Sequence, residues 1–113
     1  MVWQLTALVV SGLILVGAGI PLMRRTVPPN RWYGIRLRST LTDERIWYAV
    51  NERSGRDLVV VGTTVLIVAL AVPLVLPHWS PELRVLVVAI VLVVGLVAVT
   101  RRAVRHIKHL RPD

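Results

Sequence analysis

The sequence predicts an all-α integral membrane protein with three transmembrane helices and a structured cytoplasmic loop that contains a short amphipathic helix. Two observations carry this prediction. Hydrophobic residues make up 55% of the 113 residues, and they gather in three long apolar blocks that charged segments separate. A soluble domain of this length would instead alternate apolar and polar residues at the period of a helix or a strand. Composition therefore indicates one membrane domain, residues 1–113.

Each apolar block is long enough to cross a membrane as a helix. The first, about residues 2–23, has no charged side chain and would reach roughly 33 Å, against a hydrocarbon core of about 30 Å. The other two, about residues 58–76 and 83–100, would reach roughly 27–28 Å, which is adequate with slight bilayer thinning. The first block lacks the basic n-region and the cleavage site of a signal peptide. Pro73 is expected to kink or end the second helix.

The charges predict the orientation in the cell membrane. The loop 24–57 holds eight Arg and four acids, and the tail 101–113 holds four Arg and one Lys against one Asp. The turn 77–84 holds one Arg and one Glu. Basic residues favour the cytoplasmic side, so we expect the loop and the C-terminal tail in the cytoplasm and the N-terminus outside. The same charges favour contact with anionic lipids of the bilayer.

The basic tail carries two further patterns. Val104, Ile107 and Leu110 recur every three residues among basic side chains, which predicts an amphipathic continuation of the third helix at the lipid headgroups. His106 and His109 have a spacing that can hold a metal ion on a helix. No carboxylate or Cys is placed to complete such a site, so no metal is expected.

The loop has the chemistry of a folded segment. Pro28 and Pro29 favour an extended chain, and Asn30 and Gly34 suit turn positions that tolerate a positive φ. Arg36 follows this turn and offers a planar, forked donor for a phosphate or a carboxylate. This placement suggests the hypothesis that Arg36 binds a fixed acceptor. The acceptor would be a lipid phosphate, a helix C-terminus or a loop carboxylate.

A helix is predicted after this turn. Thr40 as N-cap and Asp43 three residues later match a capping box. An apolar face follows, which suits packing against the membrane or against other helices. Gly55 marks a bend before the second span. The residues of this apolar face are Ile46, Trp47 and Val50.

Small residues in the first span predict close helix packing. Gly12 and Gly19 lie one heptad apart, and Ala7 and Ser11 form a small-xxx-small pair. We expect these residues to pack helices of the same chain against each other. The sequence does not decide whether the chain also forms an oligomer. No ionisable residue lies deep in any span, which disfavours a proton relay or an ion pathway in one chain.

The loop residues resemble the SdpI family of bacterial membrane immunity proteins. The pattern Pro-Pro-Asn-x-x-Tyr-Gly-Ile-Arg, followed by Thr and then by Trp and Asn, carries the resemblance, which covers roughly residues 17–76. It implies protection against a secreted peptide toxin and, as in the founding example, signalling by holding a transcriptional repressor at the membrane. The signature positions, expected either to bind a partner or to hold the fold, are Asn30, Tyr33, Gly34, Arg36, Thr40, Trp47 and Asn51.

Other function classes are less well supported by the residues. There is no nucleophile–base pair, no pair of catalytic carboxylates and no phosphate-binding Gly loop, so neither an enzyme nor a cofactor is expected. The basic charge lies beside membrane spans, which favours lipid over nucleic acid as its partner. The alternatives to an immunity protein are an accessory subunit or scaffold of a larger membrane complex, and a transport component that would need an oligomer.

Overall fold

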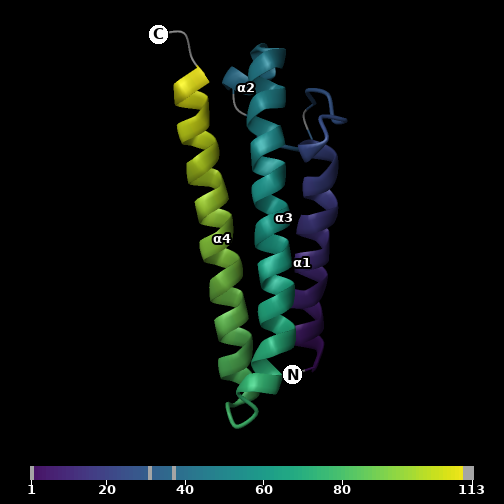
Figure 1. Ribbon diagram of the computed structural model, residues 1–113, viewed down its shortest axis with the longest axis vertical. Helices are drawn as coiled ribbons and strands as arrows, with labels where there is room; N and C mark the ends of the chain where they lie inside the picture. The colour runs from purple at the N-terminus through teal and green to yellow at the C-terminus, as the bar shows by residue number, and fades with distance from the viewer. Residues whose placement is uncertain (1, 31, 37, 111–113) are drawn as a thin grey trace.

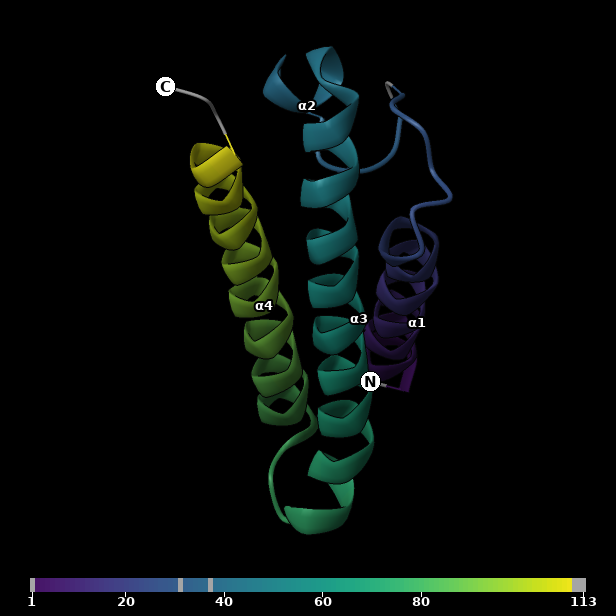
Figure 2. The ribbon, with the colours of Figure 1, turned by 45° about the horizontal axis from the view of Figure 1, so that its top comes forward.

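The computed structural model describes residues 2–30, 32–36 and 38–110. Within them the chain forms α1 (Val2–Met23), α2 (Arg38–Thr42), α3 (Glu44–Val75) and α4 (Pro81–Leu110). The three long helices run side by side, with α3 between α1 and α4, in a bundle that measures 54 × 25 × 18 Å (Figures 1 and 2). The described chain contains no strand, and these three helices are long and apolar enough to cross a membrane. The predicted fold class is confirmed.

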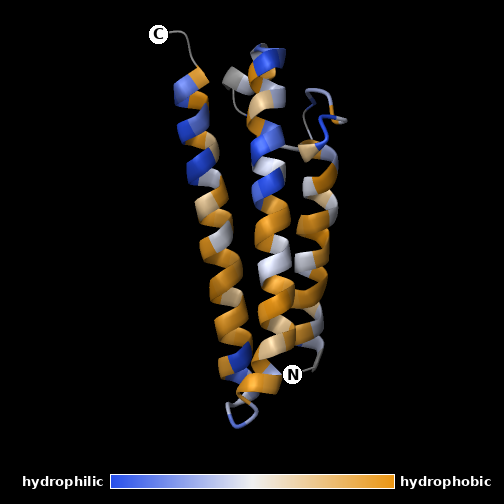
Figure 3. Cartoon of the chain, in the orientation of Figure 1, coloured by the Kyte–Doolittle hydropathy of each residue, from blue (hydrophilic) through white to orange (hydrophobic). Residues whose placement is uncertain are grey.

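The central helix α3 is longer than the predicted second span. Its 32 residues reach about 48 Å, well beyond a hydrocarbon core of about 30 Å. The amphipathic helix expected in the loop is therefore the first part of α3 and not a separate element. The bend predicted at Gly55 is absent, because this glycine is used for helix packing. The turns of α3 and α4 that extend beyond the predicted spans are hydrophilic and lie at the same end of the bundle (Figure 3).

Glycines bring α1 and α3 into backbone contact. A Cβ atom placed on Gly55 would lie 2.6 Å from the carbonyl oxygen of Gly19, and one placed on Gly62 would lie 2.6 Å from that of Gly12. The reverse contacts are also close, because a Cβ on Gly19 would lie 2.5 Å from the Gly55 oxygen and one on Gly12 would lie 3.0 Å from the Gly62 oxygen. Such proximity increases van der Waals contact, which drives helix association in lipid. The close packing predicted for Gly12 and Gly19 is made within the chain.

The opposite side of α3 packs against α4 through two apolar clusters. One, in the apolar half of the bundle, centres on Val65, Ala69 and Val88. The other joins the polar end of α3 to the tail of α4. The helix α4 continues through the tail as predicted; in that cluster Ile107 is only 4% exposed and packs against α3, whereas Val104 is 38% exposed. The buried residues of this second cluster are Ile46, Val50, Ala103 and Ile107.

The turn between α3 and α4 is set by prolines and a serine cap. The helix α3 ends at Val75, two residues after Pro73. Ser80 precedes α4, and its Oγ accepts a hydrogen bond from the backbone N–H of Leu83 at 3.3 Å. Pro81 occupies the first position of α4, where a missing N–H costs nothing. This turn fixes the antiparallel order of the two helices.

The glycine contacts yield a stability prediction. Gly55→Ala is expected to lower the free energy of unfolding by about 1–3 kcal/mol, because the new methyl would occupy the place of the Gly19 carbonyl. Gly17→Ala is the matched control, since a Cβ there meets nothing within 4 Å. It should leave stability unchanged or raise it. Thermal unfolding in detergent, followed by circular dichroism, measures both, and an equal loss in the two variants would contradict the packing argument.

Candidate functional site

The loop starts with a tight turn at the end of α1. The backbone N–H of Arg25 donates to the carbonyl of Leu22 at 3.2 Å, and that of Thr26 donates to Pro21 at 3.1 Å. This is the Schellman pattern, which usually places glycine at the left-handed position. Here Arg25 holds that position with a φ of 61°. The turn directs the chain from α1 toward the polar end of α3.

Asn30 shapes the next turn. Its Oδ1 accepts hydrogen bonds from the backbone N–H groups of Trp32 at 2.8 Å and Tyr33 at 2.7 Å, and its Nδ2 donates to the Pro28 carbonyl at 2.8 Å. An Asn side chain that caps its own following residues stabilises such a turn. The Tyr33 hydroxyl then donates to the Ala18 carbonyl of α1. Burial raises the pKa of this hydroxyl, which stays a protonated donor at neutral pH.

Asn51 on α3 holds the loop backbone at Ile35. Its Oδ1 accepts from the Ile35 N–H at 2.5 Å, and its Nδ2 donates to the Ile35 carbonyl at 3.4 Å and to the Trp47 carbonyl at 3.0 Å. The side chain is 2% exposed. Its amide therefore pairs with both backbone groups of one residue, Ile35, as a neighbouring strand would. A satisfied polar group in a buried site fixes a single geometry of the loop.

Gly34 and Trp47 complete this contact. Gly34 has a φ of 103°, and a Cβ there would lie 2.8 Å from Asn51 Oδ1 and 3.2 Å from the Trp47 ring. Glycine is thus required by both its dihedral angle and the available space. Trp47 is fully buried, and its Nε1 donates to the Val27 carbonyl at 2.8 Å. The loop is tied to α3 on both sides of its turn.

The structure corrects the predicted role of Thr40. Thr40 is fully buried within α2, and its hydroxyl donates to the Ile35 carbonyl at 2.8 Å, so it is not the N-cap. Asp43 caps α3 instead, because its Oδ1 accepts from the N–H groups of Arg45 at 3.0 Å and Ile46 at 3.4 Å. The cause is the separate turn α2, which ends before α3 begins.

Six of the seven predicted site residues therefore shape or hold the same stretch of loop. We call these six the loop network. The seventh, Arg36, lies in this stretch with an exposed side chain. It borders a cavity of about 210 Å³ whose far wall is formed by Thr100, Ala103 and Val104 of α4. The members of the loop network are Asn30, Tyr33, Gly34, Thr40, Trp47 and Asn51.

Two larger cavities lie next to the loop network. The apolar cavity, of about 460 Å³, lies beneath Tyr33, Gly34 and Ile35 and is otherwise lined by α1, α3 and α4. The charged cavity, of about 440 Å³, was not predicted from the sequence, which treated its charged residues as signals of orientation and contacts for anionic lipid, and His106 as one half of a possible metal-binding pair. Its partners come from distant segments, so no local pattern marks them. Its lining is Arg25, Ala49, Glu52, Arg53, Arg56, Asp57, Arg102 and His106.

Ion pairs cross the ends of the three long helices. Arg25 Nε lies 2.7 Å from Glu52 Oε2, and Arg102 Nε lies 2.9 Å from Asp57 Oδ2. The Arg25 guanidinium also lies 6.0 Å from the centre of the Tyr48 ring, within the range of a cation–π contact. Among the described residues, no group of three or more His, Cys, Asp or Glu side chains is placed to hold a metal ion.

Amide hydrogen exchange can test the loop network. Asn51→Leu should speed exchange across residues 27–40, because it leaves the Ile35 N–H without its partner and removes one of the two donors to the Ile35 carbonyl, at a cost of about 1–3 kcal/mol. Exchange in the apolar part of α1 and α4 should not change. Trp32→Leu is the control, since Trp32 is 87% exposed. Wild-type loop amides that exchange as fast as those of a free peptide would refute the network.

Comparison with known proteins identifies a family for the segment that contains the loop. The family model of the SdpI/YfhL protein family matches residues 26–100, a range that contains all seven signature positions. No curated protein and no solved structure matches the chain. The family match covers more than half of the chain and confirms the resemblance read from the loop residues. This chain, a multi-pass membrane protein, therefore belongs to the SdpI/YfhL family.

Proposed function

We propose that this chain is an SdpI-like immunity protein that protects a bacterium against a secreted peptide toxin, signals through its loop, or does both. Family membership supports this role, and one structural observation carries it. Six of the seven signature residues hold one stretch of loop through hydrogen bonds and close contacts, and do not lie scattered over the bundle. We further propose that the role is non-enzymatic, with binding as its chemistry.

The loop network gives the loop a defined surface. Trp32 is 87% exposed and Arg36 is exposed, yet both lie in a backbone that hydrogen bonds to the side chains of Asn30 and Asn51 hold in place. An aromatic ring and a guanidinium on a fixed backbone lose little entropy when they bind. Aromatic and Arg side chains are also the ones that contribute most at protein interfaces. These features support the loop as the element that contacts a toxin or a repressor.

We propose the orientation with the loop and the C-terminus in the cytoplasm. Single-cysteine labelling of this Cys-free chain checks it. An impermeant thiol reagent added to intact cells should label Ser80→Cys in the outer turn and leave Ser39→Cys in the loop unlabelled, because basic segments stay inside. After permeabilisation both positions should react. Labelling of Ser39→Cys in intact cells, with Ser80→Cys protected, would reverse the orientation.

A protection assay tests the immunity function. A bacterium sensitive to the toxin of an SdpI-type system should survive when it makes the wild-type chain, and Asn51→Leu should lose most of this protection by disordering the loop. Arg36→Lys should also be impaired, because Lys keeps the charge but loses the planar fork, whereas the control Arg38→Lys should protect fully. Protein levels in the membrane are measured in parallel.

The outcomes separate the function from the role of Arg36. No protection by the wild-type chain at a normal protein level, together with no partner captured from native membranes through an intact loop, would overturn the proposed function. Full protection by both Arg36→Lys and Arg36→Gln would show instead that Arg36 is exchangeable, and would leave the function itself standing.

A further inference from the structure

The charged cavity lies at the level where each long helix changes from apolar to charged. On α1 that boundary falls between Met23 and Arg25, and on α3 it falls between Asp57 and the apolar stretch that follows. On α4 it falls just before Arg101. The three boundaries coincide in space, as the change of colour along the helices shows (Figure 3). This is the depth at which the phosphates of a membrane leaflet lie.

The side chains of the charged cavity leave positive charge uncompensated. Of its four arginines, Arg25 and Arg102 pair closely with its two carboxylates. Arg53 takes part in none of the three ion pairs of the described chain. Arg56 lies 3.7 Å from Glu52, which is a loose contact with a carboxylate that already has a partner. A cavity bordered by such guanidinium groups favours an anion.

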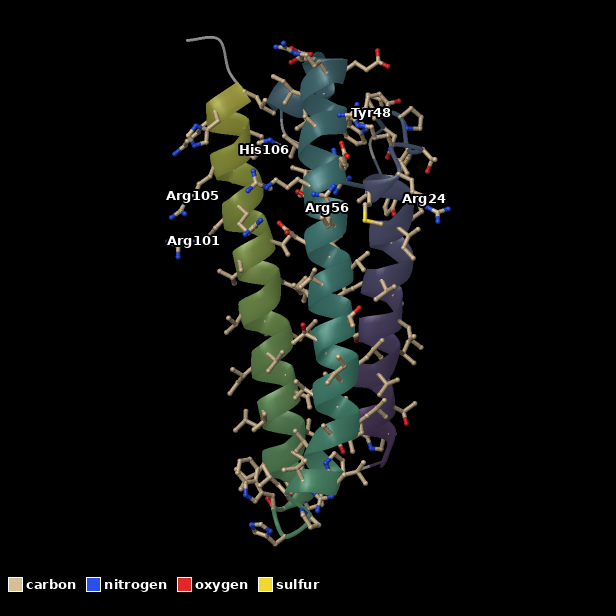
Figure 4. All side chains as sticks on the ribbon, in the orientation of Figure 1. Arg24, Tyr48, Arg56, Arg101, Arg105 and His106 are labelled. Carbon is tan, nitrogen blue, oxygen red and sulfur yellow. The ribbon has the colours of Figure 1, made fainter. Side chains whose placement is uncertain are left out.

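His106 supplies an independent observation. It extends from α4 toward α3 and lines the charged cavity (Figure 4). Its Nδ1 is buried and has no hydrogen-bond partner among the described residues. Buried polar atoms are nearly always paired in folded proteins, and this unpaired nitrogen belongs to a side chain that lines the charged cavity. A small rotation of the His106 ring would let Nδ1–H donate a hydrogen bond to an anionic oxygen in the cavity.

We propose that the charged cavity is a binding site for a phosphate group, held by Arg53 and Arg56 of α3 and His106 of α4. The cavity volume of about 440 Å³ far exceeds the roughly 30 Å³ of one water and accommodates a lipid headgroup. Its depth in the bundle identifies the headgroup phosphate of a membrane lipid as the source, with free phosphate as the alternative that shares its chemistry. This site is separate from the loop surface and does not depend on the proposed function.

Diffuse attraction between basic residues and anionic lipid is the competing explanation, and the chain contains its own control. Arg101 and Arg105 are also on α4 at this end, but they point away from α3 (Figure 4). Arg53→Gln, Arg101→Gln and Arg105→Gln each remove one positive charge, and only the first changes the charged cavity. His106→Gln changes the cavity without removing an arginine.

Native mass spectrometry of the purified full chain in detergent measures binding of phosphatidylglycerol. Phosphatidylcholine, which has a phosphate but no net charge, is the comparison lipid. Inorganic phosphate without lipid is assayed by the shift that it causes in the thermal unfolding temperature. We expect Arg53→Gln and His106→Gln each to weaken phosphatidylglycerol binding about tenfold, the effect of one lost charge-assisted hydrogen bond. Arg101→Gln and Arg105→Gln should weaken it by no more than about twofold.

Every outcome decides the proposal. Lipid binding that weakens only in the cavity variants, Arg53→Gln and His106→Gln, supports a lipid phosphate as the ligand. If lipid binding shows no such dependence, but inorganic phosphate shifts the unfolding temperature and Arg53→Gln abolishes that shift, the site is supported with free phosphate as its ligand. The site is overturned if lipid binding weakens equally in all four variants, or not at all in the cavity variants, and inorganic phosphate also causes no unfolding shift that depends on Arg53. Unfolding of each variant without ligand verifies that it is folded, and Arg53→Lys, which keeps the charge, provides a second folded variant with an expected partial loss.

Discussion

The rest of the structure depends on the close backbone contact between α1 and α3 at two pairs of glycines. In a bilayer the lipid is as apolar as the helices, so the hydrophobic effect does not drive helix association, and close packing must do so. With Gly55 against Gly19, the polar turns of α3 must stand beside the end of α1. Asn51 lies one turn from Gly55, and Trp47 lies two turns away. The chain that leaves α1 therefore passes these two side chains within a few residues, and the loop folds where they can hold it.

The loop network is stable because its buried polar groups satisfy one another. The Asn51 amide uses both its oxygen and its nitrogen, and the Ile35 carbonyl accepts from both Asn51 and Thr40. In a buried site a half-satisfied network costs more than an apolar one, so the residues of this group depend on each other. The half-exposed ion pair between Arg25 and Glu52 contributes little energy by comparison and serves mainly to position the end of α1.

Features that depend on a local pattern of residues could be predicted from the sequence. Features that depend on partners far apart in the chain could not. Long apolar blocks predict the three spans, and the turn and signature residues predict an ordered loop. Thr40 and Asp43 both have capping chemistry, and only the position of α2 decides that Asp43 caps α3. The charged cavity depends on pairs such as Arg102 and Asp57, which are 45 residues apart and meet only after the helices pack.

The continuity of α3 has a mechanical consequence. This helix runs unbroken from the loop network to the turn outside the opposite end of the bundle, and its backbone contacts with α1 at Gly55 and Gly62 lie near its middle. A pivot at these glycines would leave arms of roughly 17 and 20 Å on the two sides. Tilting it by about five degrees would displace both ends by about 1.5 Å in opposite directions, so that contact at one membrane face reaches the other without a hinge or a change of fold.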